Sequence, residues 1–240
     1  MPNQTYEQRA ERILRYLKAD KRYNNGYLPR PFFVELTGSP SAGKTTTITE
    51  LYKFFRRLGF RVLRPQEGAE VIQHIPRTTP VYNIRTGIYA LTMLLDESYK
   101  HTYDLIILDR GIFDTYAWMM YWQDKGLLTP EECTLVQSFF LSRFWADQTD
   151  AAYFMVCEAQ EAMRREMRIA LSDRMGETTN PDSIVKLISR YTTAFRRLRH
   201  DHPQLQLMDT TGMDEQAMVS AVATETLSAL ERCIEQEKPA

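Results

Sequence analysis

The feature that most constrains this chain is an apolar run that ends in a glycine-rich loop and continues as a helix. Residues 32–36 read FFVEL, and residues 38–45 read GSPSAGKT, which fits the phosphate-binding pattern GxxxxGK[ST] without a mismatch. Such a loop turns its backbone N–H groups inward around a phosphate, and the positive end of the following helix points at the same anion. The sequence therefore predicts a nucleotide-binding loop between a buried strand and a helix.

Two side chains of this loop have specific predicted roles. Lys44 supplies a compact positive charge between the β- and γ-phosphates, and the Thr45 hydroxyl is placed to ligate Mg²⁺. Thr46 is a further candidate contact, for the α-phosphate. The residues predicted to bind ATP are Gly38, Ser39, Pro40, Ser41, Ala42, Gly43, Lys44, Thr45 and Thr46.

Strand and helix patterns alternate along most of the chain. Predicted strands cover residues 32–38, 60–65, 104–110, 151–157 and 205–211, and helices are predicted at 6–19, 44–58, 83–100, 112–124, 130–145, 184–200, from 158 and at the C-terminal end. This order predicts an α/β fold, the three-layer P-loop NTPase fold, with a mainly parallel five-stranded sheet, an N-terminal helix and a helical lid region. Ligands of such sheets bind at the carboxyl ends of the strands.

Composition narrows the class of protein further. The 240 residues suffice for one well-packed domain, and the formal net charge of −1 argues against bulk binding to nucleic acid or to an anionic membrane. No apolar run is long enough to cross a bilayer, and the polar N-terminus lacks the apolar core of a signal peptide, so we expect a cytoplasmic protein. The three cysteines, Cys133, Cys157 and Cys233, are widely spaced and indicate neither a disulfide framework nor a zinc site.

A carboxylate and an arginine follow the third predicted strand. The run DLIIL ends in Asp109, which would face the phosphates and hold the shell of the same Mg²⁺ that Thr45 ligates. Arg110 comes next, and its planar guanidinium suits a pair of phosphate oxygens. A salt bridge at the strand end is the alternative role for both residues.

With these motifs the chain resembles the nucleoside and nucleoside-monophosphate kinases, and the thymidylate-kinase and deoxynucleoside-kinase branch is closest in layout. The likeness covers most of residues 32–236 and rests on the P-loop, the Asp-Arg pair and an arginine-bearing helix after the fourth strand. It implies ATP- and Mg²⁺-dependent phosphoryl transfer to a nucleoside or nucleoside monophosphate. The chain length predicts a single domain overall, with a kinase-like domain at 32–240. The N-terminal helical extension at 1–31 is extra to the minimal fold of the family.

The resemblance implies further site residues. An acidic residue after the second strand often binds or activates the acceptor in these kinases, and Glu67 matches that position better than Glu70. The lid of the family corresponds to about residues 158–183, where Arg164 and Arg168 share a helix face and would close over the transferring phosphate. A solvated surface is the alternative role for these charged side chains.

Other functions stay open at this point. A regulatory or switch P-loop NTPase would hydrolyse ATP to control a partner protein, and other acceptors include a sugar, a vitamin precursor or a polynucleotide end. The near-neutral charge argues against the polynucleotide, and the chain lacks the Asn-Lys-x-Asp element of GTPases. The sequence predicts no membrane association, and it leaves open a homodimer or a regulatory protein partner.

Overall fold

The computed structural model describes residues 4–19, 28–169 and 180–236. In this part of the chain five strands form one sheet in the order β2-β3-β1-β4-β5, and every neighbouring pair is parallel. The strands are β1 (Phe32–Gly38), β2 (Val62–Leu63), β3 (Leu105–Asp109), β4 (Ala151–Val156) and β5 (Leu205–Asp209). The predicted fold class is confirmed.

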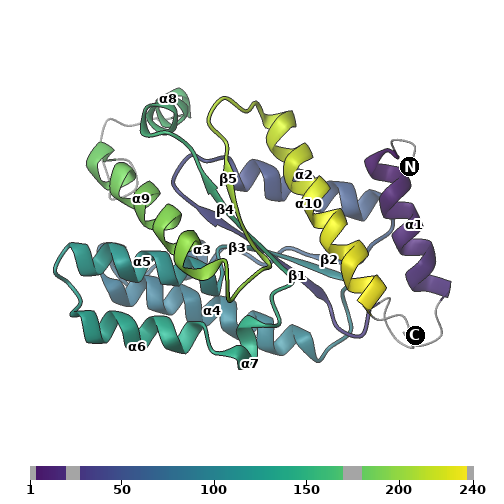
Figure 1. Ribbon diagram of the computed structural model, residues 1–240, viewed down its shortest axis with the longest axis horizontal. Coiled ribbons are helices and arrows are strands. Elements are labelled where there is room, and N and C mark those ends of the chain that lie inside the picture. The colour runs from purple at the N-terminus through teal and green to yellow at the C-terminus, as the bar shows by residue number, and fades with distance from the viewer. Residues whose placement is uncertain (1–3, 20–27, 170–179, 237–240) are drawn as a thin grey trace.

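Helices cover both faces of the sheet, as Figure 1 shows. The described helices are α1 (Tyr6–Ala19), α2 (Lys44–Arg57), α3 (Gly68–Val71), α4 (Pro80–Ser98), α5 (Ile112–Asp124), α6 (Pro130–Phe140), α7 (Arg143–Ala146), α8 (Ala159–Ile169), α9 (Pro181–Leu198) and α10 (Glu215–Gln236). None of the described helices is long and apolar enough to span a membrane.

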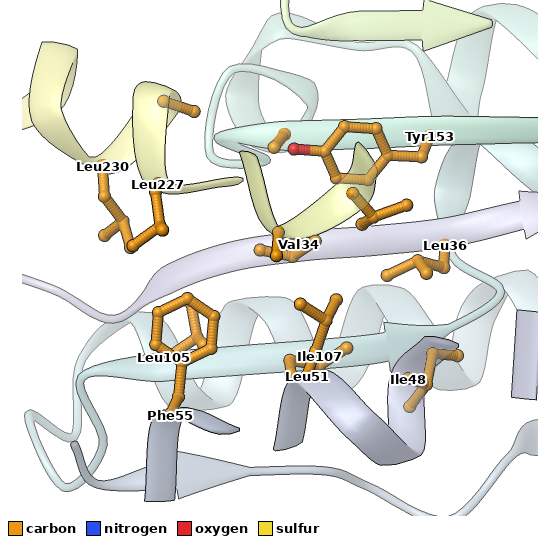
Figure 2. Packing of buried hydrophobic residues seen from close by; sticks show 14 of the residues in the cluster. Val34, Leu36, Ile48, Leu51, Phe55, Leu105, Ile107, Tyr153, Leu227 and Leu230 are labelled. Carbon is orange, nitrogen blue, oxygen red and sulfur yellow. The ribbon is translucent and has the colours of Figure 1, made fainter. Parts of the chain in front are cut away.

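Side chains of each central strand alternate between two cores. On one face Val34 and Leu36 of β1 pack with Tyr153 of β4 against α2 and α10, where Figure 2 shows them beside Ile48 and Leu227. The opposite side chains of β1 and β4 pack under the helices of the other face, which include α4, α5 and α9. Because both faces are covered, the strands read as continuous apolar runs rather than as alternating ones.

The N-terminal helix belongs to the first of these cores. Ile13, Leu14 and Leu17 of α1 are buried in the cluster that contains β1 and α10. Arg9 pairs with Glu231 of α10 at 2.6 Å. The division into an extension and a kinase-like domain at residue 31 stays a prediction, but α1 shares its core with the sheet.

Two predicted elements differ from the structure. The second strand was expected over residues 60–65 and consists of two residues, because Phe60 still bonds back to Phe55 at the end of α2 and Pro65 has no N–H to donate. The helix predicted over 130–145 divides into α6 and α7. At the break the Trp145 indole donates to the Phe140 carbonyl at 3.0 Å and satisfies an acceptor that a continuous helix would have used.

Candidate active site

The phosphate loop starts where β1 ends, at Gly38. The φ of Gly38 is +135°, and a Cβ there would lie 1.8 Å from the Met155 carbonyl oxygen of β4, so only glycine fits. The Ser39 N–H donates to the same carbonyl at 2.9 Å. The backbone of β4 therefore fixes the point at which the loop leaves the sheet.

Lys44, the first residue of α2, lies inside this loop. Its side chain donates to the carbonyl oxygens of Gly38 and Ser39 at 3.1 and 2.6 Å. The pKa of the ammonium is lowered to about 8, by burial first and by the charge of Arg110 second, while Asp109 acts in the opposite sense. A bound phosphate would supply the negative charge that this buried ammonium lacks.

A cavity of about 1040 Å³ opens beside the loop. Its walls are the start of α2, the first turns of α8 and the segment that joins β5 to α10, and its lining includes Lys44, Thr45, Thr46, Arg164 and Met213. This volume is at the upper end of the usual range for ligand pockets, about 300–1,000 Å³. The cavity is therefore large enough for a nucleoside triphosphate with its phosphates in the loop.

Arg165 of α8 joins two walls of this cavity. Its guanidinium donates to the Ser41 carbonyl in the phosphate loop at 3.2 Å, and to the carbonyls of Thr210 and Met213 after β5 at 2.8 and 3.2 Å. It also donates to Glu161 at 2.6 Å on its own helix. The sequence analysis missed this structural role, because nothing in an arginine-rich helix tells which arginine faces the loop.

Of the two predicted lid arginines, Arg164 has described contacts, whereas Arg168 is placed only by its position in α8. Arg164 lines the cavity, its side chain is 61% exposed, and it pairs with Glu161 at 2.7 Å. Arg168 lies in the last turn of α8, and residues 170–179 of the predicted lid lie outside the described residues. A closing lid that brings these arginines to the phosphates stays a prediction.

Asp109 ends β3 at the centre of the sheet, level with Leu36 of β1. Its pKa is raised to about 6, by burial first and by the neighbouring carboxylate of Glu67 second, while nearby cationic side chains act in the opposite sense. An adjacent divalent cation would favour the ionised form of this desolvated carboxylate. Asp109 and Thr45 are both oxygen donors at the phosphate end of the fold, so these residues suit the predicted Mg²⁺.

Arg110 and Glu67, predicted separately, meet in the structure. The Arg110 Nε donates to Glu67 Oε1 at 3.1 Å, and both side chains are partly exposed. Arg110 has a φ of +65°, a left-handed conformation that costs an arginine roughly 1–2 kcal/mol. Burial lowers the Arg110 pKa, but the nearby carboxylates and Tyr191 more than offset this, and the pKa lies well above its ordinary value.

Behind Arg110 lies a buried polar cluster that the sequence analysis missed. It comprises Glu35 and Thr37 of β1, Asp114 of α5 and Tyr191 of α9, all nearly inaccessible to solvent. Two signals pointed to it: a glutamate inside the apolar strand FFVELTG, and an aspartate four residues after Arg110, one helical turn along. Neither signal identifies the partner of the buried charge, which depends on tertiary contacts.

The fold is shared with known kinases. A structure of the deoxyadenosine kinase from M. mycoides, with the products dCMP and a flexible dCDP bound, has 14% identity and a TM-score of 0.59 over 82% of this chain and 100% of its own. Thymidylate kinase from Candida albicans has 12% identity and a TM-score of 0.54 over 84% of this chain and 94% of its own. At these identities the likeness is one of fold, and at that level the predicted resemblance to nucleoside and nucleotide kinases is confirmed.

No curated protein matches the chain in sequence. A family model described as AAA domain matches residues 33–174. The match covers more than half of the chain and includes the phosphate loop, Asp109 and Arg110. The chain therefore belongs to the AAA domain family.

Proposed function

We propose that this protein is an ATP- and Mg²⁺-dependent phosphotransferase that acts on a nucleoside or a nucleoside monophosphate. The observation that carries the proposal is the contact of Arg110 with Glu67 beside Asp109, next to a complete phosphate loop. A nucleotide hydrolase needs the loop, the metal carboxylate and a positioned water. A kinase also needs a carboxylate for the acceptor hydroxyl and a cation for the transferred phosphoryl group, and Glu67 and Arg110 supply both.

The chemistry assigns one task to each side chain. Lys44 neutralises the β- and γ-phosphates, and Arg110 stabilises the charge on the transferring group. Glu67 accepts the proton of the acceptor hydroxyl while the hydroxyl oxygen bonds to the γ-phosphorus and the bond from that phosphorus to the bridging oxygen of ADP breaks. When bound, Mg²⁺ offsets the negative charge on the phosphate oxygens, and Thr45 and Asp109 are the residues that would hold it.

Charge near Glu67 favours a neutral hydroxyl over a phosphate as the acceptor group. Glu67, Asp109 and Asp114 all lie around Arg110, and two of them pair with it directly. A monophosphate would bring two more negative charges to this group, whereas a hydroxyl brings a proton that Glu67 can take. We therefore rank a nucleoside above a nucleoside monophosphate.

The acceptor side of the cleft is narrow beside Asp109 and Arg110. A hollow of about 10 Å³ lies beside Asp109 and Arg110, between α3 and α4, and its lining includes Gly68 and Tyr89. That space suits about one water molecule. Entry of a nucleoside therefore requires α3 to move away from α4, and this fits an acceptor that assembles its own site on binding.

ADP formation with and without an acceptor tests the proposal. The protein is incubated with MgATP and a panel of ribonucleosides, deoxynucleosides and their monophosphates, and phosphorylated products are identified by mass. We expect at least about tenfold stimulation by one acceptor class, because binding of the correct acceptor completes the site. Glu67→Gln should lower the stimulated rate about 100-fold, the usual size of a general-base effect.

Glu70→Gln is the matched control, because Glu70 lies one turn along α3 and is exposed. It should retain the rate of the wild type. ATP hydrolysis at one rate with every acceptor and with none would refute the kinase. That result would favour the regulatory NTPase that controls a partner protein.

A further inference from the structure

Asp114 is a buried charge that contacts Arg110. Its side chain is 4% exposed, and its carboxylate accepts from Arg110 Nη1 at 3.2 Å through Oδ1 and at 3.4 Å through Oδ2. The hydroxyls of Thr37 and Tyr191 also donate to Oδ1. A buried carboxylate is tolerated when it is paired and hydrogen-bonded, and Asp114 has three donors from three different elements.

The guanidinium of Arg110 therefore has two carboxylate partners of different kinds. Glu67 holds Nε from the cleft side, and its side chain is 26% exposed. Asp114 holds Nη1 from the interior. Only the outer partner is open to solvent, so an arriving acceptor can compete with Arg110 for Glu67 and leaves the contact with Asp114 intact.

The position of Asp114 is itself fixed by its surroundings. Its backbone N–H donates to Glu35 Oε1 of β1 at 3.0 Å, and the N–H of Phe113 donates to Oε2 at 3.3 Å. Glu35 thereby binds the N-terminal end of α5, where the helix dipole favours an anion or an acceptor. Gly111 allows this approach, because a Cβ there would lie 2.3 Å from Glu35 Oε2.

The three donors connect regions with different roles. Thr37 directly precedes Gly38, the first residue of the phosphate loop, and Arg110 follows the metal carboxylate Asp109. Tyr191 lies on α9, which runs alongside α5 in Figure 1. One carboxylate thus links the end of β1, next to the phosphate loop, with Arg110 and α9 by direct hydrogen bonds.

We propose that Asp114 is the positioning residue of Arg110: it fixes the guanidinium to β1 and α9, so that Arg110 stays directed at the phosphoryl group when Glu67 turns to the acceptor. This inference rests on the proposed function, because Arg110 acts there on the transferred group. Asp114 touches no substrate and acts through Arg110. The left-handed backbone of Arg110 is consistent with this, since such a conformation persists where the surrounding contacts hold it.

A double-mutant cycle between Asp114→Asn and Arg110→Met tests the inference. Arg110→Met should lower kcat about 100-fold, and Asp114→Asn about 30-fold with the KM for ATP within about twofold, because only the transferring group is affected. In the Arg110→Met background, Asp114→Asn should lower kcat by less than about twofold, since the residue through which it acts is gone. A full 30-fold loss in both backgrounds would overturn the inference.

Asp124→Asn is the matched control for a role in holding helices together. Asp124 also lies on α5 and pairs with Arg190 of α9, but neither residue contacts Arg110 in the described contacts. We expect its kcat within about twofold of the wild type. An equal loss in Asp124→Asn and Asp114→Asn would mean that both aspartates only join α5 to α9, and would overturn the positioning role.

Thr37 offers a second route if Asp114→Asn does not fold. Thr37→Val removes the donor, whereas Thr37→Ser keeps it, so Thr37→Val should lose about threefold in kcat and Thr37→Ser should not. The loss should vanish in the Arg110→Met background. Equal kcat for the two Thr37 variants, or a loss that persists without Arg110, would count against the inference.

Failure of the positioning role can be distinguished from failure of the proposed function. A wild type that phosphorylates no acceptor refutes the kinase. The same cycles are then read in acceptor-independent ATP hydrolysis, in which Arg110 still meets the γ-phosphate. A wild type that is active but gives independent effects of Asp114 and Arg110 refutes the role of Asp114 alone.

Discussion

The donor and acceptor sides of this cleft are built in different ways. The donor side is one continuous segment, residues 38–46, in which the Lys44 ammonium donates to two backbone carbonyl oxygens. The acceptor side brings Glu67, Arg110, Asp114 and Tyr191 together from three separate segments of the chain, and side-chain carboxylates hold it together. The predicted phosphate site therefore depends on local conformation, whereas the proposed acceptor site depends on tertiary contacts.

Burial shifts the pKa of charged groups on both sides of the cleft, and on each side it favours the neutral form. On the donor side, burial lowers the pKa of Lys44 to about 8. On the acceptor side, burial raises the pKa of Asp109 to about 6 and, in the cluster behind Arg110, that of Glu35 to about 8. On both sides burial disfavours the charged form of the group, and an adjacent opposite charge would favour it again.

The largest expected effect is on the donor side. Lys44→Ala should lower turnover at least about 1,000-fold, or about 4 kcal/mol of transition-state stabilisation, because the variant loses the cation that bonds the carbonyls of Gly38 and Ser39. The fold should persist, since the lysine is held in the loop at a cost that its lowered pKa reports. Rates of ADP formation and thermal unfolding of the two proteins measure both claims.

Lys53→Ala is the control for this variant. Lys53 lies on the same helix, is about half exposed and pairs with Glu50. It should keep the rate of the wild type, because a surface ion pair contributes little. Turnover near the wild-type rate in folded Lys44→Ala would contradict the assignment of the phosphate loop.

Asp109→Asn tests the predicted metal carboxylate, and we expect about a 100-fold loss of turnover. The Mg²⁺ concentration for half-maximal rate should rise, since an amide is a weaker ligand than a carboxylate. Asp96→Asn, at an exposed position of α4, should change neither property.

An unchanged Mg²⁺ requirement in Asp109→Asn would reassign Asp109 to a structural contact. The same variant should unfold at a higher temperature than the wild type near pH 7. Its native pKa is raised, so the ionised carboxylate costs stability above its unfolded pKa, and the amide removes about 1 kcal/mol of that cost.

The difference between the two sides also decides what the sequence could predict. Periodic apolar runs predicted the strands and most helices, and GSPSAGKT predicted the phosphate loop, because both are local patterns. Arg110 and Glu67 were predicted as candidates from their positions after strands. Their contact with each other was not, because it depends on how α3 packs beside β3.

The cluster behind Arg110 lay beyond sequence reasoning for a physical reason. Tyr191 is 77 residues from Asp114 along the chain, and nothing local in either segment marks the other as a partner. A buried polar group shows in a sequence only as a break in an apolar pattern, as Glu35 does within FFVELTG. Arg165 shows the same limit, because its contacts with Ser41 and Thr210 across the cavity include backbone carbonyls, which every residue has.

Glu35→Gln tests the acceptor-side cluster through stability. The pKa of Glu35 is raised to about 8, by burial first and by the charge of Asp114 second, while backbone N–H groups of Gly111, Phe113 and Asp114 act in the opposite sense. Because the folded pKa exceeds the unfolded one, Glu35 contributes stability that is complete below about pH 4.5 and lost as the pH rises through about 8. The free energy of unfolding should therefore fall across this range.

In Glu35→Gln the fall in the free energy of unfolding between pH 5 and pH 8.5 should be smaller by about 2 kcal/mol, as measured by denaturant unfolding. Asp109 has a raised pKa as well, so the comparison is repeated in the Asp109→Asn background, where the difference due to Glu35 should remain. Identical pH dependence with and without Glu35 would mean that this carboxyl group is ionised in the folded protein at neutral pH.

The smallest effect is expected from Arg165→Met, and its comparison with Arg164→Met separates two neighbours on α8. Arg165 donates to the Ser41 carbonyl and to two carbonyls after β5, so it holds two walls of the donor cavity together. Methionine keeps the apolar length but none of these bonds, and the walls become less ordered before ATP binds. We expect the KM for ATP to rise about fivefold, near 1 kcal/mol, with kcat within about twofold, because ordering precedes the transfer.

Arg164 pairs with Glu161 and lines the same cavity, and as a lid arginine it would act on the transferring phosphate. Arg164→Met should therefore lower kcat and leave the KM for ATP nearly unchanged. Steady-state kinetics of both variants distinguishes these roles. A loss of kcat in Arg165→Met, with none in Arg164→Met, would assign the contact with the transferring phosphate to Arg165 instead of Arg164.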